Sequence, residues 1–219
     1  MTEYNRCRLM LAASPTNASQ ELLSAALEAG DVAGIILYCN EEATHAFEPF
    51  CEAVVPHAQS LDIAVLVADD SQIAGRVGAD GYYLERDRSN LNDALARFSP
   101  QKIVGCGGML DRHQALKLGE TGIEFLVFGK LGRDTRPEPH RKNLALAQWW
   151  AEFVELPCVI LAGNSVDSVI EAAKTGADFV LLDQAVFGEG ATRESVRRAI
   201  ANANSLLDEH APLLEEADA

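Results

Sequence analysis

The fold of this chain is decided by the stretch Ala172-Ala173-Lys174-Thr175-Gly176-Ala177-Asp178-Phe179-Val180-Leu181-Leu182. It reads as the end of an amphipathic helix, a glycine that permits a left-handed C-cap, a short polar step and an apolar strand. The same unit recurs before the apolar runs that begin at Ile35, Gly81 and Phe125. A repeated helix–glycine–strand unit is typical of a parallel sheet covered by helices.

Working outward from this unit, we predict eight strands, each followed by a helical pattern, the last of which covers residues 193–209. The predicted strands cover residues 7–13, 32–38, 63–67, 81–84, 102–105, 125–128, 158–161 and 179–182. This alternation predicts an α/β protein with one (β/α)₈ barrel domain over residues 1–219. An open doubly wound sheet is the alternative, but Ser14-Pro15-Thr16-Asn17 is not its Gly-rich first turn.

Composition and charge exclude several classes of protein. The chain has 219 residues, 48% of them hydrophobic, and a formal net charge of −15, so we expect no nucleic-acid partner. No apolar run reaches the roughly 18 residues of a membrane span, and the polar start does not resemble a signal peptide. We therefore expect no membrane partner and a cytoplasmic location. The five cysteines form no CxxC pair, which favours reduced thiols. The acidic tail, residues 212–219, is expected to fray.

Ligand sites of such barrels lie on the loops that follow the strands, and phosphate often binds after the seventh and eighth. Gly163 and Asn164 follow the seventh predicted strand, and Gln184 follows the eighth. Because small residues let backbone N–H groups approach an anion, we predict that these residues bind a phosphate. The alternative is an ordinary connection that caps a helix. Asp183 counts against phosphate, since its carboxylate repels one unless a cation intervenes.

The loop after the sixth predicted strand, residues 129–142, is the longest and the most basic. Long loops in small domains are usually lids or binding loops. We predict that it closes over an anionic ligand and binds phosphate groups through Lys130, Arg133, Arg136 and Lys142. The alternative is a solvated loop whose charges balance nearby acidic residues.

Acidic residues after the third and fourth predicted strands suggest a metal ion. Asp69 and Asp70 follow the third strand, and Asp87 lies just after the fourth. Carboxylate oxygens suit Mg²⁺, which often bridges to phosphates. We therefore predict Mg²⁺ on Asp69, with Asp87 as a second ligand. Asp70 has the alternative role of capping the next helix.

Other reactive residue types give weaker signals. Cys106 has no adjacent histidine, so we expect no thiolate nucleophile there. His140, in the basic loop, is the histidine that we consider as a candidate proton donor or acceptor. Trp149, Trp150 and Phe153 form an aromatic patch on one predicted helix. This patch is either part of the core or a contact in a homo-oligomer.

These features together resemble the thiamine-phosphate synthase family, which includes the related thiazole tautomerases. The likeness runs from about Arg8 to Phe187. It is carried by Val67-Ala68-Asp69-Asp70, Ile73-Ala74, Gly78-Ala79-Asp80-Gly81, Gly122-Ile123-Glu124-Phe125-Leu126-Val127-Phe128-Gly129, Pro157-Cys158-Val159-Ile160-Leu161-Ala162-Gly163 and Gly176-Ala177-Asp178. The resemblance implies a transferase of thiamine biosynthesis that joins a pyrimidine methyl diphosphate to a thiazole phosphate. The released diphosphate would be stabilised by Mg²⁺ and basic side chains.

The resemblance assigns Asp69 to the metal ion and Gly163 to a phosphate loop, and it places Asp87 one position from the second metal ligand. The active-site pattern otherwise departs from the family. Its Gln-x-Arg-x-Lys at the end of the second strand reads Ile36-Leu37-Tyr38-Cys39-Asn40 here. Its Ser-Thr-His after the fifth strand reads Gly107-Gly108-Met109.

The first hypothesis is therefore a thiamine-phosphate-synthase-like transferase whose basic loop has replaced the missing cations, with the catalytic residues unassigned. Its partners would be small phosphorylated metabolites. The second hypothesis is a non-catalytic barrel that binds a phosphorylated ligand or a protein. The third is a barrel enzyme that acts on another phosphorylated metabolite.

Overall fold

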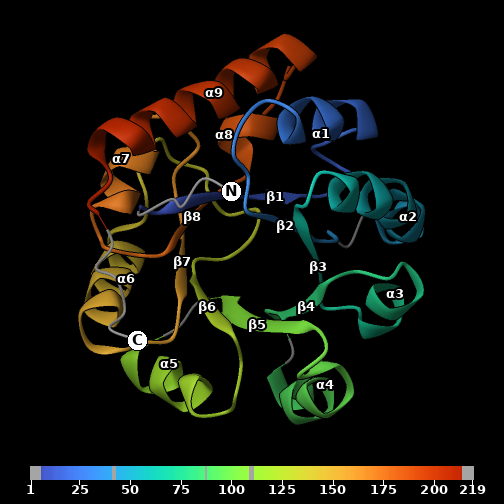
Figure 1. The fold of residues 1–219 in the computed structure, drawn as a ribbon, viewed down its shortest axis with the longest axis vertical. Coiled ribbons are helices and arrows are strands. Elements are labelled where there is room, and N and C mark those ends of the chain that lie inside the picture. Colours follow the sequence, from blue (N-terminus) through green and yellow to red (C-terminus); the bar gives the residue numbers. More distant parts are fainter. Residues whose placement is uncertain (1–5, 41–42, 87, 109–110, 214–219) are drawn as a thin grey trace.

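The computed structural model describes residues 6–40, 43–86, 88–108 and 111–213, and it confirms the (β/α)₈ barrel. Each strand pairs in parallel with the next, and β8 closes on β1 (Figure 1). The strands are β1 (Arg8–Ala13), β2 (Gly34–Leu37), β3 (Ala64–Ala68), β4 (Gly81–Leu84), β5 (Ile103–Gly108), β6 (Phe125–Phe128), β7 (Cys158–Leu161) and β8 (Phe179–Leu182).

Helices surround the barrel on the outside (Figure 1). They are α1 (Gln20–Leu27), α2 (Thr44–Ser60), α3 (Ser71–Arg76), the 3₁₀ turn η2 (Arg88–Asn90), α4 (Leu91–Phe98), α5 (Arg112–Gly119), α6 (Arg141–Phe153), α7 (Ser168–Ala173), α8 (Gln184–Phe187) and α9 (Arg193–His210). The long last helix, α9, packs against α1, α7 and α8, which joins the end of the chain to its beginning.

In two of the helix–glycine–strand units, the acidic residue directly before the strand binds the backbone of the neighbouring strand. Asp178, just before β8, accepts a hydrogen bond from the N–H of Cys158 in β7 at 2.8 Å. Asp80, just before β4, accepts one from the N–H of Val65 in β3 at 2.8 Å. We call these contacts the acidic clamps. Each clamp fixes the register of two neighbouring strands at their N-terminal ends.

The core consists of two apolar layers. The larger layer lies between the strands and the helices. The smaller one fills the inside of the barrel and is called the inner cluster here. Its buried members are Met10, Ala12, Ile36, Tyr38, Leu66, Ala68, Tyr83, Phe125, Val127, Leu131, Val159, Leu161 and Leu181. Leu131 is the member that comes from a loop rather than from a strand or its end.

The strand β5 extends to Gly108, three residues beyond the predicted end at Gly105. Judged from the sequence alone, its glycines suggest a turn, but in the structure they leave room for neighbouring strands to pack. A Cβ atom at Gly107 would lie 2.4 Å from the hydroxyl of Tyr83 and 2.7 Å from Cβ of Val127. The residues between Gly105 and Gly108 therefore belong to the barrel wall.

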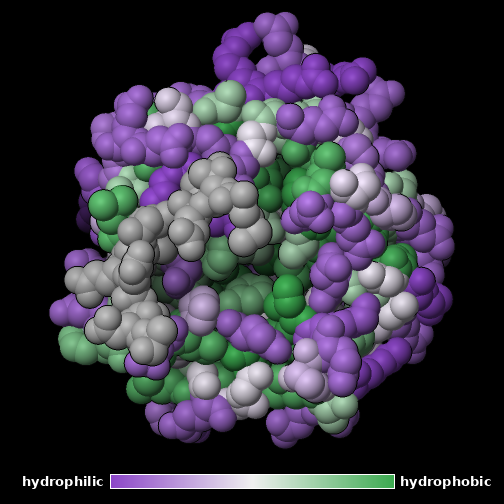
Figure 2. Space-filling model, in the orientation of Figure 1, coloured by the Kyte–Doolittle hydropathy of each residue, from purple (hydrophilic) through white to green (hydrophobic). Residues whose placement is uncertain are grey.

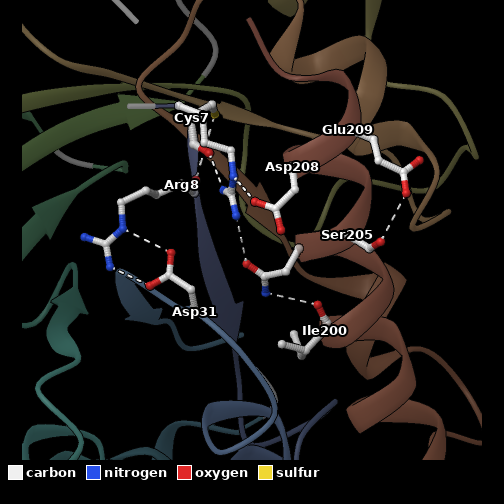
Figure 3. A network of polar contacts seen from close by, with 9 residues as sticks. Cys7, Arg8, Asp31, Ile200, Ser205, Asp208 and Glu209 are labelled. Carbon is white, nitrogen blue, oxygen red and sulfur yellow. Dashed lines mark hydrogen bonds and ion pairs between the residues drawn. The ribbon is translucent and has the colours of Figure 1, made fainter. Parts of the chain in front are cut away.

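The start of β1 is held by two ion pairs (Figure 3). Arg6 donates to Asp208 of α9 at 2.7 Å, and Arg8 donates to Asp31, before β2, at 2.7 Å. Figure 2 shows hydrophobic residues in a hollow at the centre of one face and hydrophilic residues around its rim. This distribution fits a barrel with an apolar interior and a polar outer surface.

The predicted aromatic patch on α6 divides into two parts. Trp150 is fully buried, and its indole N–H donates to the carbonyl of Leu156 at 2.7 Å, whereas the Phe153 residue is 67% exposed. Trp150 is therefore a core residue, and the patch as a whole is not. None of the described helices is long and apolar enough to cross a membrane. Most of the predicted acidic tail, residues 214–219, lies outside the described residues.

Candidate functional site

The candidate site lies at the C-terminal ends of the strands, where polar side chains from several loops converge on Asp183. Asp183 directly follows β8 and is fully buried. Its carboxylate accepts hydrogen bonds from the Asn17 side-chain amide at 2.6 Å and from the Tyr38 hydroxyl at 2.8 Å. The backbone N–H of Gly132 donates to the same carboxylate at 3.1 Å. One buried carboxyl group thus connects the loops that follow β1, β2, β6 and β8.

A second buried carboxyl group, Asp134, lies beside the first. Its Oδ2 accepts a hydrogen bond from the N–H of Gln184 at 2.7 Å, and its Oδ1 has no partner among the described residues. Burial raises the pKa of Asp134 and of Asp183, and the charge of Asp134 raises the pKa of Asp183 further. Two close carboxyl groups resist double ionisation. The pair therefore keeps a proton at pH values where an exposed aspartate is ionised.

Glu85, at the end of β4, is the third buried carboxyl group of the site. It accepts a hydrogen bond from the N–H of Leu131 at 2.9 Å. Burial raises the pKa of Glu85 to about 6, although the bond from Leu131 and the charge of Lys130 oppose the rise. This glutamate thus links the end of β4 to the loop after β6.

The loop between β6 and α6, residues 129–140, is called loop 6 here and covers the mouth of the barrel. Its Leu131 side chain packs in the inner cluster. Among the basic residues predicted to bind phosphate, Lys130 is half-buried, and Arg133, Arg136 and Lys142 are exposed. The side chains of these last three make no hydrogen bond or ion pair within the described part of the chain. Loop 6 therefore presents its backbone and Leu131 to the barrel, and its guanidinium groups to solvent.

The residues predicted to bind the second phosphate lie together, but their N–H groups have partners within the chain. Gly163 donates to the Ser168 hydroxyl at 3.0 Å, and Asn164 donates to the carbonyl of Arg136 at 2.7 Å. The N–H of Gln184 binds Asp134, as described above. A phosphate can use the donors of Asn164 and Gln184 only where it replaces acceptors that belong to loop 6.

The predicted metal ligands offer a poor site as they stand. Asp69 has a left-handed backbone, with φ of 58°, and its Oδ1 accepts N–H bonds from Glu85 at 2.8 Å and Arg86 at 3.1 Å. Its Oδ2 lies 3.7 Å from the Arg86 guanidinium. Asp70 caps α3, and Asp87 lies outside the described residues. The described ranges hold no group of three or more acidic, histidine or cysteine side chains that fits a metal ion.

Two surface cavities lie beside the loops that follow the strands. One, of about 490 Å³, lies between α3 and α4 and includes Asp69 and Arg97 in its wall. The other, of about 290 Å³, lies between loop 6 and α7. Neither is lined by a residue of the inner cluster.

Two further sequence expectations concern single residues. Cys106 is fully buried, and burial raises the pKa of its thiol to about 11, which leaves no reactive thiolate at neutral pH. His140 caps α6: its Nδ1 accepts the N–H of Lys142 at 3.3 Å. This histidine has a structural contact in the helix cap.

Sequence reasoning missed Asn17, Tyr38, Glu85 and Asp134 as members of the site. Tyr38 carries one signal, since it stands where the resembled family has the arginine of its second-strand motif. Asp134 is hidden among basic residues, and its partner Gln184 is 50 positions further along the chain. No local pattern indicates that pairing.

Comparison with known proteins identifies the family. A family model described as thiamine monophosphate synthase matches residues 9–186. This chain belongs to the thiamine monophosphate synthase family. The thiamine-phosphate synthase of Rhodospirillum centenum is 31% identical over 178 residues, which are 80% of this chain and 86% of that protein. The thiamine-phosphate synthase of Hyphomonas neptunium is 30% identical over 191 residues, 83% of this chain and 86% of that protein.

Solved structures agree on the fold. Thiamine phosphate pyrophosphorylase from Pyrococcus furiosus superposes with a TM-score of 0.76 at 22% identity and covers 95% of this chain and 98% of its own. Membership of the thiamine monophosphate synthase family confirms the resemblance seen in the sequence, and with it the expected class of protein, an enzyme of the transferase type. The site of this family member nevertheless contains the buried carboxyl groups of Glu85, Asp134 and Asp183.

Proposed function

We propose that this chain is a thiamine-phosphate-synthase-like transferase, which joins a pyrimidine methyl diphosphate to a thiazole phosphate and releases diphosphate. The observation that carries the proposal is the family match over residues 9–186, which spans every strand of the barrel except the first residue of β1. The polar groups of the loops at the C-terminal mouth support it, because this end of the barrel is where such enzymes bind their substrates.

In the dissociative reaction that the family resemblance implies, the bond between the pyrimidine methyl carbon and the diphosphate breaks first, and the thiazole then bonds to that carbon. Negative charge develops on the diphosphate, so preorganised positive groups lower the barrier. The basic groups proposed for this role are Lys130, Arg133 and Arg136 of loop 6 and Lys142 in the first turn of α6. Arg133 and Arg136 are exposed, and within the described part of the chain their guanidinium groups make no hydrogen bond or ion pair, so they are able to bind phosphate oxygens. They take the role of the cations that the second strand lacks.

The phosphate of the second substrate is expected to bind the N–H groups near Gly163, Asn164 and Gln184. Asp69 Oδ2 is the described oxygen that would hold Mg²⁺, with Asp87 as the second ligand in the proposal. The Arg86 guanidinium competes for that oxygen. Removal of divalent ions with a chelator, followed by addition of Mg²⁺ alone, tests this part of the proposal independently.

The test is an endpoint assay for thiamine phosphate with both substrates and Mg²⁺. The double variant Arg133→Ala/Arg136→Ala is expected to lose about 10²-fold or more in kcat/KM, because two charge-assisted contacts are each worth about 1.5–3 kcal/mol. Arg193→Ala is the matched control, since Arg193 is an exposed arginine at the start of α9. Equal activity of the double variant and the control would exclude a role for the Arg133 and Arg136 guanidinium groups.

A non-catalytic phosphate-binding barrel is the second candidate. It is favoured by the losses in the family's active-site pattern: Tyr38 and Asn40 stand in place of the second-strand cations, and Gly107-Gly108-Met109 replaces Ser-Thr-His after the fifth strand. A rise in Tm with thiamine phosphate, together with no product in the assay, would support this candidate over the transferase.

A further inference from the structure

Loop 6 fills the place in the barrel mouth where a substrate would bind. Leu131 is only 7% exposed and packs with Tyr38 and Leu161 in the inner cluster. Gly132 follows with a left-handed φ of 69°, and a Cβ atom there would lie 3.1 Å from the Tyr38 hydroxyl. The chain is therefore pressed against the end of β2 at this point. In this fold ligands bind at the mouth, so the loop and a ligand compete for the same space.

Buried carboxyl groups attach the first half of the loop to the barrel. Glu85 accepts the N–H of Leu131 at 2.9 Å, and Asp183 accepts the N–H of Gly132 at 3.1 Å. Asp134, from the loop itself, reaches back to the N–H of Gln184 at 2.7 Å. All three carboxyl groups are at least nine-tenths buried. Hydrogen bonds of this kind are strong where water is excluded.

The second half of the loop is attached to the loop after β7. The carbonyl of Arg136 accepts the N–H of Asn164 at 2.7 Å. Gly163 lies so close to the loop that a Cβ atom there would be 2.1 Å from the carbonyl oxygen of Pro137. Two acceptors in loop 6, the Arg136 carbonyl and the Asp134 carboxylate, thus bind the N–H groups of Asn164 and Gln184. These are N–H groups that we expect the second phosphate to need.

We propose that loop 6 is an internal plug: it occupies the barrel mouth and must leave before the phosphorylated substrates bind. A lid would close further over a bound ligand, whereas a plug is displaced by it. The inference rests on the proposed function for the chemical class of the ligand. Because only the open fraction binds, the apparent affinity for diphosphate is lower than the intrinsic one.

Limited proteolysis and binding measured on one variant test the plug. Trypsin is expected to cut after Lys130 and Arg133 once the loop opens. Leu131→Ala removes the apolar anchor, and Leu116→Ala is the matched control, since Leu116 lies on α5 and is 44% exposed. We expect at least about tenfold faster cleavage of Leu131→Ala, because cleavage follows the open population. Inorganic diphosphate with Mg²⁺ should bind Leu131→Ala about tenfold more tightly than wild type.

Each alternative outcome would overturn the plug. Equal cleavage rates in Leu131→Ala and wild type would show that Leu131 does not hold the loop. Faster cleavage with unchanged or weaker diphosphate binding would make loop 6 a lid or a purely structural loop, and so would absence of binding by both proteins. If Leu131→Ala does not fold, Glu85→Gln weakens the acceptor of the Leu131 N–H, and the same expectations apply to it.

The plug and the proposed function can fail separately. Tighter diphosphate binding by Leu131→Ala, without thiamine phosphate formation by either protein, would refute the transferase and leave the plug standing. Product formation by wild type, with the same KM and the same cleavage rate in Leu131→Ala, would refute the plug and leave the transferase standing.

Discussion

Gly163→Ala is expected to push loop 6 out of the barrel mouth without removing any polar group. The added Cβ atom would lie 2.1 Å from the carbonyl oxygen of Pro137, 2.5 Å from its carbonyl carbon and 2.7 Å from the carbonyl oxygen of Arg136. All three are backbone atoms, so no flexible side chain can rotate away. Ordinary contacts begin at about 3.4 Å. The loop backbone must therefore move by about 1 Å.

The cost follows from this displacement. Overpacking of a close contact costs about 1–3 kcal/mol, and the shift also breaks the hydrogen bond from Asn164 to Arg136, worth about 1 kcal/mol. We expect a destabilisation of about 2–4 kcal/mol, which lowers Tm by roughly 4–16 °C for a chain of this size. Trypsin cleavage after Arg133 should become faster, because the open loop is more accessible.

The assay combines thermal melting with the rate of tryptic cleavage. Gly75→Ala is the matched control, because a Cβ atom there would meet its nearest atom, of the Arg97 side chain, at 3.4 Å. That control should be neutral or stabilised by up to about 1 kcal/mol, since alanine is the better helix former. If Gly163→Ala melts like wild type and its loop is cut at the same rate, the described packing of loop 6 on the β7 loop is wrong.

Three other predictions follow from single features of the site and core. Burial raises the pKa of Glu85 to about 6 and that of Asp183 to about 7, so the native protein binds more protons than the unfolded chain between about pH 4 and 7. Stability should therefore fall as pH rises through this range, and melting of Glu85→Gln between about pH 4 and 6.5 should show a smaller fall; an equal fall would contradict the raised pKa. Asp69→Asn keeps an acceptor for its backbone partners. It is expected to fold normally and to lose turnover in the thiamine phosphate assay, and a fully active variant would remove Asp69 from the metal site. Trp150→Ala removes a fully buried ring and its hydrogen bond to Leu156, so we expect it to lower the free energy of unfolding in urea by about 3–5 kcal/mol. Trp150→Phe keeps an aromatic ring and should lower it by less. Similar losses in both variants would show that burial of the ring contributes little.

The barrel could be predicted from the sequence because its determinants are local. Apolar runs bounded by a glycine and an acidic residue mark the strands, and the segment ending in Gly176-Ala177-Asp178 before β8 is typical. The extent of β5 could not be predicted in the same way. Gly107 and Gly108 look like a turn, and only the neighbouring Tyr83 and Val127 show why no side chain is allowed.

The sequence indicates at which end of the barrel the candidate site lies, but not which side chains meet there. The sequence predicts a site on the loops after β3, β4, β6, β7 and β8, and in a parallel barrel these loops lie at the same end. The sequence suggested that loop 6 would turn its cations inward. Instead the N–H groups of Leu131 and Gly132 meet buried carboxylates from β4 and β8. Those partners are about 50 residues away in sequence, so no spacing rule connects them.

The acidic clamps have a consequence for how this protein can change. Asp80 and Asp178 act at the N-terminal ends of the strands, whereas loop 6 and Asp183 lie at the opposite ends. The contacts that fix the strand register and the contacts that hold loop 6 therefore lie at opposite ends of the barrel. A loop 6 transplanted from a relative would leave both clamps unaltered, and the contacts that it has to match are those with Glu85, Asp183 and the inner cluster.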